Sequence, residues 1–480
     1  MKKIIASLAI LTAAALFSQR AGAQEEWTAR GIGAAACPAE IAAIEAPFEM
    51  PALQRPVFAD RSLDIKARGA RQGRKCTAVI QKCIDQLSAK GGGKVIIPAG
   101  DWLTGRLILK SGVCLHLEEG AVLRFTGEVE DYLPAVFTRS EGIEIYSTGA
   151  CIYARDAENI GITGKGTLVG PPQGSPVQTL NMSGVVVEKF VDYNSPVESR
   201  VYDTIHNTDG LEHGARTPNP LFSPLFFSPV DCKNVLVEGV RFQDSIFWNI
   251  VPIYCDGVII RGVTVDSRGG RTDGIDIDSS QNVLIEYVTL GCGDDCFTIK
   301  AGRCEDGIRV NRPTANVVIR HCLALRGPGG LTCGSETAGW IRNVYCYDCA
   351  FLNVSNGFYF KTRRTRGGGV ENVWVDGIVM QGVKNAFGWD MLGSRTYVGE
   401  LADRFPVREI GPLTPAFRQI HISNVDIESC RTLFSIKAIP EIPLEGLYIK
   451  NMNATCSQMG SMQDVGLITF DNCNIRTVQQ

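Results

Sequence analysis

Short stretches in which apolar and polar residues alternate recur along most of the chain. Each contains a Val directly after an Asn or a Gly and spans nine or ten residues, a pattern typical of half-buried β-strands. Six consecutive examples are NVLVEGVRF (234–242), GVIIRGVTV (257–265), NVLIEYVTL (282–290), NVVIRHCLAL (316–325), NVYCYDCAF (343–351) and NVWVDGIVM (372–380). Their valines lie 23 to 34 residues apart, with turns rich in Gly and Asn between them and no helical pattern. Repeats this short predict an all-β protein, a right-handed parallel β-helix.

One helix is expected near the N-terminal end of this solenoid. In CTAVIQKCIDQLSAKGGG (76–93), five apolar residues fall at helical spacing, and the glycines at 91–93 should end the helix. These five residues are Val79, Ile80, Cys83, Ile84 and Leu87. A helix laid across the first coil would cover its exposed strand edges, so we expect it to cap the β-helix.

The first 23 residues have the pattern of a signal peptide. Two lysines precede an apolar run over residues 4–17, and the small residues at 21–23 suit signal peptidase, with cleavage before Gln24. The run is too short for a stable anchor, and no later stretch approaches the roughly 20 apolar residues of a membrane helix. We therefore expect export to the periplasm, the cell surface or the medium, without a membrane span.

The remaining residues, 24–480, are predicted to form a single domain. No linker rich in Pro or Ser interrupts the repeats, and a solenoid grows without dividing its core. The net charge is −3, and Lys and Arg are spread along the chain, so the sequence contains no basic cluster of the kind that binds nucleic acid. We expect a monomer that does not bind nucleic acid.

The 17 cysteines are expected to be mostly buried thiols. Many lie within the strand patterns, where a small apolar residue suits the core. We expect few disulfides, with one candidate among Cys292, Cys296 and Cys304. Only five histidines are present and none clusters with cysteine, so no zinc site is expected.

Acidic residues between positions 271 and 300 indicate a catalytic site. In RTDGIDIDSSQNVLIEYVTLGCGDDCFTIK, Asp273 lies 21 residues before Asp294, which forms an adjacent pair with Asp295. This separation is close to the repeat period, so the three carboxylates should lie on neighbouring coils of one surface. Clustered acids on a rigid scaffold are what hydrolysis of a glycosidic bond requires.

Strand parity predicts which way these side chains point. In CFTIK (296–300), Phe297 and Ile299 should point inward and the other three residues outward. Asp294 shares the outward parity. Asp295 does not, and it can face the same surface only if a turn or bulge at residues 291–293 breaks the alternation.

Several other polar residues near these motifs are expected to meet solvent. Asp276 and Asp278 alternate with the isoleucines of GIDID (274–278), so they either line the groove or meet solvent, and contact with water is the simpler interpretation of each. The same interpretation applies to Arg364, Arg366 and His321.

Four segments in order resemble the motifs of glycoside hydrolase family 28, the polygalacturonases and their relatives. They are TDGIDID (272–278), GDDCFTIKAG (293–302), GPGGLTCGSE (327–336) and FYFKTRRTRGG (358–368). The resemblance extends over nearly the whole chain after the signal peptide. It implies hydrolysis of α-linked galacturonic acid in pectic polysaccharide or oligosaccharide, with inversion of configuration. We expect neither a cofactor nor a metal.

The resemblance also implies a role for each acid. Asp294 resembles the general acid that protonates the leaving oxygen, and Asp273 and Asp295 resemble the pair that holds and deprotonates water. Repulsion and partial burial should raise the pKa of one carboxyl, leaving a proton donor beside ionised bases. Inversion typically needs roughly 6.5 to 9.5 Å between acid and base.

A uronic acid substrate needs cations where it binds. In FYFKTRRTR (358–366), Tyr359, Lys361 and Arg363 share the outward face and are predicted to bind substrate. Lys361 resembles the family lysine that pairs with a galacturonate carboxylate.

Three positions depart from the family pattern. Pro328 replaces the histidine of Gly-His-Gly, Tyr359 replaces the arginine of Arg-Ile-Lys, and Arg271 replaces the asparagine of Asn-Thr-Asp. The first two losses concern substrate recognition, whereas all three acids remain. The altered motifs favour an unusual linkage, such as galacturonic acid next to rhamnose, or action at chain ends.

Two alternatives stay open from the sequence. One is a pectate-lyase-like enzyme, which would use calcium and a basic arginine, although no carboxylate cage beyond the GDD segment is evident. The other is a pectin-binding β-helix without turnover, which the missing histidine makes plausible.

Overall fold

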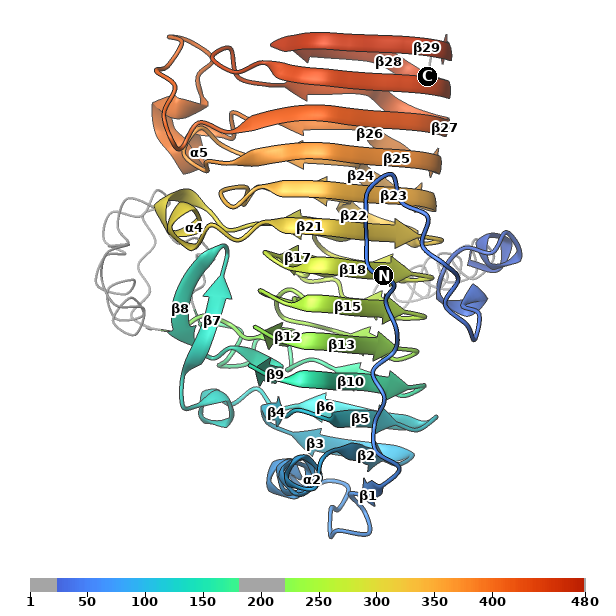
Figure 1. Cartoon of the computed structure of the whole chain (residues 1–480), viewed down its shortest axis with the longest axis vertical. Helices are drawn as coiled ribbons and strands as arrows, with labels where there is room; N and C mark the ends of the chain where they lie inside the picture. The colour runs from blue at the N-terminus through green and yellow to red at the C-terminus, as the bar shows by residue number, and fades with distance from the viewer. Residues whose placement is uncertain (1–23, 181–220, 479–480) are drawn as a thin grey trace, which may run out of the picture.

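The computed structural model describes residues 24–180 and 221–478 and shows a long column of coils made of parallel strands (Figure 1). The predicted signal peptide, residues 1–23, lies outside the described residues. Successive coils add strands to three stacks, each paired in parallel along the axis. The architecture is a right-handed parallel β-helix, which confirms the prediction from the repeats.

The first stack runs the full length of the column. Its strands are β1 (Ser62–Asp64), β2 (Gly93–Ile97), β5 (Val113–Leu117), β10 (Glu158–Gly164), β13 (Lys233–Glu238), β15 (Asp256–Arg261), β18 (Gln281–Glu286), β21 (Thr314–Arg320), β23 (Ile341–Leu352), β25 (Gly369–Gln381), β27 (Ala416–Lys437), β28 (Leu444–Gln463) and β29 (Val465–Thr477). The second stack consists of β3 (Gly100–Thr104), β6 (Ala121–Phe125), β11 (Thr167–Val169), β14 (Arg241–Gln243), β16 (Thr264–Asp266), β19 (Thr289–Gly291) and β22 (Leu323–Cys333).

The third stack carries the acidic motifs. It contains β4 (Leu107–Leu109), β9 (Ala150–Arg155), β12 (Leu225–Val230), β17 (Ile275–Asp278), β20 (Phe297–Lys300), β24 (Val354–Lys361) and β26 (Val383–Asp390). The later halves of β22 and β27 also pair into it. Beside it stands an antiparallel hairpin, β7 (Val136–Ser140) and β8 (Ile143–Ser147) (Figure 1).

A ladder of asparagines explains why Val follows Asn in the repeats. Asn282, Asn316 and Asn343 have φ between 55° and 58°, the left-handed region that Asn tolerates better than most residues. The Nδ2 of Asn316 donates to Oδ1 of Asn282 over 3.1 Å, and Asn343 donates to Asn316 over 3.0 Å. Where Gly257 stands in the same position, φ is 75°. The sequence pattern therefore marks one recurrent corner of each coil.

Helix α2 (Thr77–Ala89) covers the N-terminal end of the column, as predicted (Figure 1). Its buried residues Ile80, Cys83, Ile84 and Leu87 are at most 2% exposed and join the main core. Helices α4 (Cys304–Val310) and α5 (Arg395–Val398) are short. In the described ranges, no helix is both long enough and apolar enough to cross a membrane.

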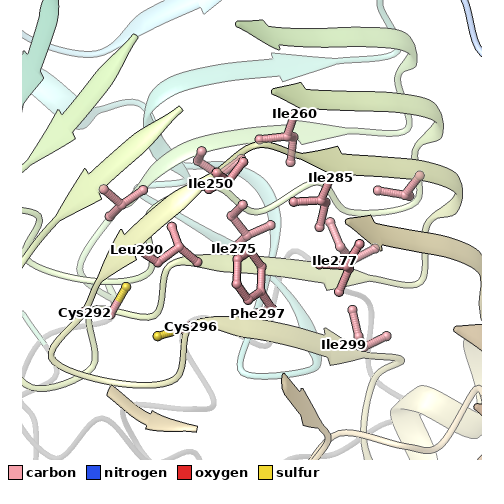
Figure 2. Packing of buried hydrophobic residues seen from close by; sticks show 14 of the residues in the cluster. Ile250, Ile260, Ile275, Ile277, Ile285, Leu290, Cys292, Cys296, Phe297 and Ile299 are labelled. Carbon is pink, nitrogen blue, oxygen red and sulfur yellow. The ribbon is translucent and has the colours of Figure 1, made fainter. Parts of the chain in front are cut away.

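The core beneath the acidic motifs is a stack of aliphatic and aromatic side chains (Figure 2). Ile275 lies opposite Phe297, and Ile277 lies opposite Ile299, on adjacent strands β17 and β20. All four side chains are fully buried, so Phe297 and Ile299 point inward as predicted. This packing directs the alternate residues of both strands to the outer face.

The cysteines remain free thiols throughout. The disulfide considered for Cys292, Cys296 and Cys304 is not formed. Cys292 and Cys296 instead extend the apolar core, where the small thiol fills space between strands (Figure 2).

Candidate active site

The three predicted catalytic aspartates come together on the third stack. One carboxylate oxygen from each of Asp273, Asp294 and Asp295 lies within 4.8 Å of the other two. Asp273 precedes β17, and the other two precede β20, the next strand along the stack. A separation of 21 residues in sequence thus corresponds to one coil of the β-helix.

A turn allows both adjacent aspartates to reach this surface. Residues 292–296 lie outside any strand, and the pairing register shifts just before them. The backbone N–H of Asp295 donates to Oδ1 of Asp294 over 3.0 Å. The predicted break in alternation is therefore present. The same turn directs Cys296 into the core beside Cys292, so the expectation that Cys296 points outward is wrong (Figure 2).

The Gly-Pro-Gly motif packs tightly against this turn. A Cβ on Gly329 would lie 2.0 Å from Oγ1 of Thr332 and 2.7 Å from Oδ1 of Asp295. A Cβ on Gly327 would lie 2.7 Å from the carbonyl oxygen of Asp294. Only glycine permits such close backbone approach, so both glycines support the position of the carboxylates.

Exposure distinguishes the three acids. Asp295 is 0% exposed and Asp273 is 3% exposed, whereas Asp294 is only partly buried. Burial raises the pKa of Asp294, and repulsion from Asp295 raises it further. Burial, together with repulsion from Asp276 and Asp294, holds the pKa of Asp273 well above its usual range. The cluster therefore retains protons at pH values where isolated aspartates are ionised, and Asp294 is the member that can meet a substrate.

Lys361 contacts the aspartate cluster directly. Its Nζ lies 2.6 Å from Oδ2 of Asp295 and 4.7 Å from the centre of the Tyr359 ring. Burial lowers the pKa of Lys361, but the combined attraction of Asp295, Tyr359 and Asp294 raises it above its usual value, so the ammonium stays charged. Arg363 lies two residues beyond the end of β24, where its side chain packs against Gly393.

A second lysine, Lys300, for which the sequence indicated no role, also lies among the acidic residues. Its Nζ lies 3.1 Å from Oε2 of Glu336, 3.6 Å from Oδ1 of Asp276 and 4.0 Å from Oδ2 of Asp273. The Lys300 side chain is 5% exposed, and its Nζ also lies 4.4 Å from the centre of the Trp248 ring. Parity predicted its outward direction, but nothing in the sequence alone paired it with Glu336, 36 residues away.

The expectation of solvated side chains is wrong for four residues. Asp276 and Asp278 are at most 1% exposed, and Asp278 pairs with the buried Arg139 over 2.9 Å. Arg364 and Arg366 are 6% and 1% exposed, because each pairs with a buried glutamate. The third stack holds a network of buried ion pairs that alternation alone does not reveal.

His321 is half-buried and directly follows β21 of the first stack. Its ring stacks on that of Tyr287, with ring centres 4.8 Å apart. This position is on another stack from the aspartates, so His321 does not replace the missing histidine of the Gly-His-Gly motif.

The family model of the glycosyl hydrolases family 28 matches residues 94–391, more than half of the chain and the whole acidic cluster. The chain belongs to this family. It is therefore a glycoside hydrolase, and family 28 enzymes act on pectic polysaccharide.

Family 28 relatives include plant and bacterial proteins. A probable polygalacturonase of Vitis vinifera is 27% identical over 390 residues, covering 78% of this chain and 70% of the relative. An endo-polygalacturonase of Pectobacterium carotovorum is 28% identical over 323 residues, covering 64% of this chain and 69% of the relative. Among solved structures, a hyperthermoactive exopolygalacturonase of Thermotoga maritima superposes with a TM-score of 0.74 at 28% identity, covering 88% of this chain and 94% of that one.

The structure shows what surrounds the residues that depart from the family 28 motifs. Pro328 is partly exposed, and its carbonyl oxygen accepts a hydrogen bond from Nδ2 of Asn356 over 3.1 Å. Arg271 extends over the ring of Phe247, with its guanidinium carbon 5.0 Å from the ring centre. Nearby, Arg326 donates from Nε to the carbonyl oxygen of Cys292 over 2.9 Å. It therefore supports the turn that carries Asp294 and Asp295.

Proposed function

We propose that this protein hydrolyses α-galacturonosyl linkages in pectic polysaccharides and oligosaccharides. The observation that carries the proposal is the meeting of three carboxylates within 4.8 Å beside a charged lysine. Membership of family 28 supports the same reaction class. The first experiment is incubation of the purified protein with defined pectic oligosaccharides, followed by identification of the products.

In this mechanism the partly exposed Asp294 delivers its proton to the leaving glycosidic oxygen. Asp273 and Asp295 hold a water molecule and remove its proton as it attacks the anomeric carbon. Ionised carboxylates beside the sugar also stabilise the positive charge that develops on the ring. Each proton transfer of this kind typically contributes about 10²- to 10⁴-fold to the rate.

Inversion of configuration is part of the proposal. The nearest oxygens of the three acids are within 4.8 Å, closer than the roughly 6.5 to 9.5 Å typical of inverting enzymes. That rule concerns the separation of whole carboxyl groups. The distance between the nearest oxygens therefore does not decide between inversion and retention of configuration. Inversion rests on the family resemblance, and NMR detection of the first anomer released is its test.

We further propose action at chain ends. The hairpin β7–β8 stands beside the site, held by the buried Arg139–Asp278 pair. At its tip, the carbonyl oxygen of Gly142 accepts a hydrogen bond from the backbone N–H of Arg303 over 3.2 Å. A fixed wall beside the acids restricts how far a polymer extends past them, and the similar Thermotoga maritima enzyme is an exopolygalacturonase. Exo action predicts early release of short products with a slow fall in viscosity.

Export is proposed from the pattern of residues 1–23. Pectic polymers are too large to enter a cell intact, so the substrate favours a location outside the cytoplasm. N-terminal sequencing of the protein recovered from its natural compartment tests cleavage before Gln24. Size-exclusion chromatography of the same sample tests whether the protein is a monomer.

A further inference from the structure

Arg271 departs from the family motifs, and the proposed mechanism gives it no role. It lies two residues before Asp273, in the loop between β16 and β17. This loop is held against the turn that carries the other two acids, because the backbone N–H of Gly293 donates to Oγ1 of Thr272 over 3.1 Å. A Cβ on Gly293 would lie 2.0 Å from the carbonyl oxygen of Gly269. The backbone of Arg271 is therefore fixed beside the aspartate cluster.

The backbone conformation at position 271 does not favour arginine. Its φ is 63°, in the left-handed region. Glycine and asparagine adopt this region at little cost, and asparagine is the residue of the family motif, whereas a long side chain is uncommon there. The turn alone therefore does not account for Arg271. Its presence is best explained by what its side chain contacts.

An aromatic pair supports the guanidinium group of Arg271. The guanidinium carbon lies 5.0 Å from the centre of the Phe247 ring, and this ring stacks on that of Trp248 with the centres 5.2 Å apart. Both aromatic residues are at most 6% exposed, so the pair is a rigid support. The Trp248 ring also contacts Lys300, whose Nζ lies 4.0 Å from Oδ2 of Asp273. Two cations, one against each ring, thus lie close to the acids.

These two cations differ in what they bind. The ammonium of Lys300 lies within 4.0 Å of three carboxyl groups, so acids of the protein already satisfy it. The partly buried side chain of Arg271 forms no hydrogen bond or ion pair with any residue that the structure describes. Burial raises the pKa of Glu141, at the tip of the hairpin β7–β8, and Arg303 and Arg271 oppose this rise. The N–H donors of Arg271 are therefore available to a ligand near both the acids and the hairpin.

We infer that Arg271 is a specificity-determining residue that binds the carboxylate of a galacturonosyl unit next to the bond that is cleaved. A planar guanidinium matches a carboxylate with two parallel hydrogen bonds, and its support on Phe247 reduces the freedom lost on binding. Arg271 thus supplies the contact that Tyr359, which stands in place of the family arginine, cannot make. The inference rests on the proposed function, because it names the substrate group that this same site holds.

The order of strands in the third stack places this carboxylate opposite the one expected at Lys361. The order along the column is β17, β20, the later half of β22, and β24. Arg271 precedes β17, whereas Lys361 ends β24 and reaches back to Asp295. The two cations therefore approach the acids from opposite directions along the column. Each galacturonosyl unit carries one carboxylate, so a substrate that spans the acids can meet both cations.

The direct test measures binding without turnover. Isothermal titration of the Asp294→Asn protein uses trigalacturonate and a rhamnogalacturonan oligosaccharide as probes. Addition of Arg271→Met should raise the Kd of at least one probe about ten- to a hundredfold, since hydrogen bonds between charged groups are lost. The methyl ester of the same probe has no carboxylate charge, so the added substitution should change its Kd by no more than about threefold.

Three further variants separate binding from a structural role. Arg271→Lys keeps the charge but loses the planar fork, so its loss of affinity should be intermediate. Arg271→Asn should lose as much affinity as Arg271→Met while its unfolding temperature stays close to that of the parent, because asparagine adopts the left-handed backbone readily. The matched control is Arg268→Met, three residues earlier in the same loop, whose side chain is 64% exposed. It should bind both probes like the parent.

Each outcome of the titrations decides the inference. It is overturned if the Asp294→Asn protein binds neither probe, if Arg271→Met binds the acid forms as tightly as its parent, or if the acid and its ester weaken equally. An equal effect of Arg268→Met would overturn it as well. Binding that depends on Arg271, in a protein whose wild type releases no product from either probe, would refute the proposed hydrolysis and leave the inference standing.

Discussion

The Nζ atom of Lys361 lies 2.6 Å from Oδ2 of Asp295. A residue that is expected to bind substrate therefore forms an ion pair with a residue that is expected to act in catalysis. An ammonium group has three donors, and this contact occupies one of them. The remaining donors can meet a sugar carboxylate that approaches the site. In the proposed mechanism Lys361 therefore joins substrate recognition to the charge state of the aspartate cluster, and its removal should affect both.

Lys361→Met should lower kcat as well as raise KM, with kcat/KM falling at least about a hundredfold. The variant loses a charged hydrogen bond to Asp295 in addition to any bond to the sugar. Steady-state kinetics on a galacturonate oligosaccharide measures both constants. Lys361→Arg, which keeps the charge, is the control and should retain more activity. An effect confined to KM would show that the contact with Asp295 has no catalytic consequence.

The same substitution should move the alkaline limb of the kcat/KM profile to higher pH. In the proposed mechanism Asp294 acts in its protonated form, and Lys361 lowers the pKa of Asp294 against the upward effects of burial and Asp295. Without that positive charge the pKa rises, so the proton is kept to a higher pH. A pH profile of the Met variant beside the wild type measures the shift. Movement to lower pH would contradict the proposed electrostatics.

Asp294→Asn should reduce kcat at least about a hundredfold without unfolding the protein, because the amide keeps the shape but cannot deliver a proton. Thermal unfolding should stay close to that of the wild type, since the side chain is partly exposed. Near-normal turnover in a folded variant would exclude Asp294 as the general acid.

Gly329→Ala should impair catalysis more than stability. The new methyl group would lie 2.0 Å from Oγ1 of Thr332 and 2.7 Å from Oδ1 of Asp295, so both side chains must move. Overpacking of this kind lowers the free energy of unfolding by about 1 to 3 kcal/mol. A displacement of a catalytic group by about 1 Å lowers the rate about a hundredfold. Gly270→Ala is the control, because no atom lies within 4 Å of a Cβ there. Equal activity of the two variants would show that the close packing does not position Asp295.

The altered motifs predict a shifted substrate preference. The wild type should have a higher kcat/KM on rhamnose-containing or otherwise substituted pectic fragments than on unbranched polygalacturonate. Pro328 cannot supply the hydrogen bonds of a histidine, and Tyr359 offers an apolar face better suited to a deoxysugar methyl group than to a carboxylate. The double variant Pro328→His, Tyr359→Arg should move the preference towards polygalacturonate. A wild-type preference for polygalacturonate would mean that other residues meet the sugar carboxylates.

The fold could be predicted because its causes are local. The left-handed corner at Asn282, Asn316 and Asn343 recurs on each coil, and the alternation between corners specifies strands. The period then placed Asp273 beside the turn that carries Asp294 and Asp295. Because the coils repeat, a separation along the chain corresponds to a position in space. The acidic cluster could therefore be predicted from the sequence.

The buried charges could not be predicted in the same way. Strand alternation distinguishes the inner from the outer face, but it does not show whether the outer face meets water. The hairpin β7–β8 and the segments after β20 and β22 cover the face of the third stack, so Asp276, Asp278 and Lys300 are buried outside the core. Their partners Arg139 and Glu336 come from distant parts of the chain.

The nature of the first product tests the central claim most directly. The protein, incubated with a galacturonate-containing oligosaccharide of defined linkage, should release a saturated sugar with a new reducing end at galacturonic acid. Activity should survive a calcium chelator, since the proposed chemistry uses only side-chain carboxyls. An unsaturated product that absorbs in the ultraviolet would identify a β-eliminating lyase. Binding without any product, across the full set of pectic linkages, would identify a pectin-binding protein without turnover. Either result would contradict hydrolysis by Asp273, Asp294 and Asp295.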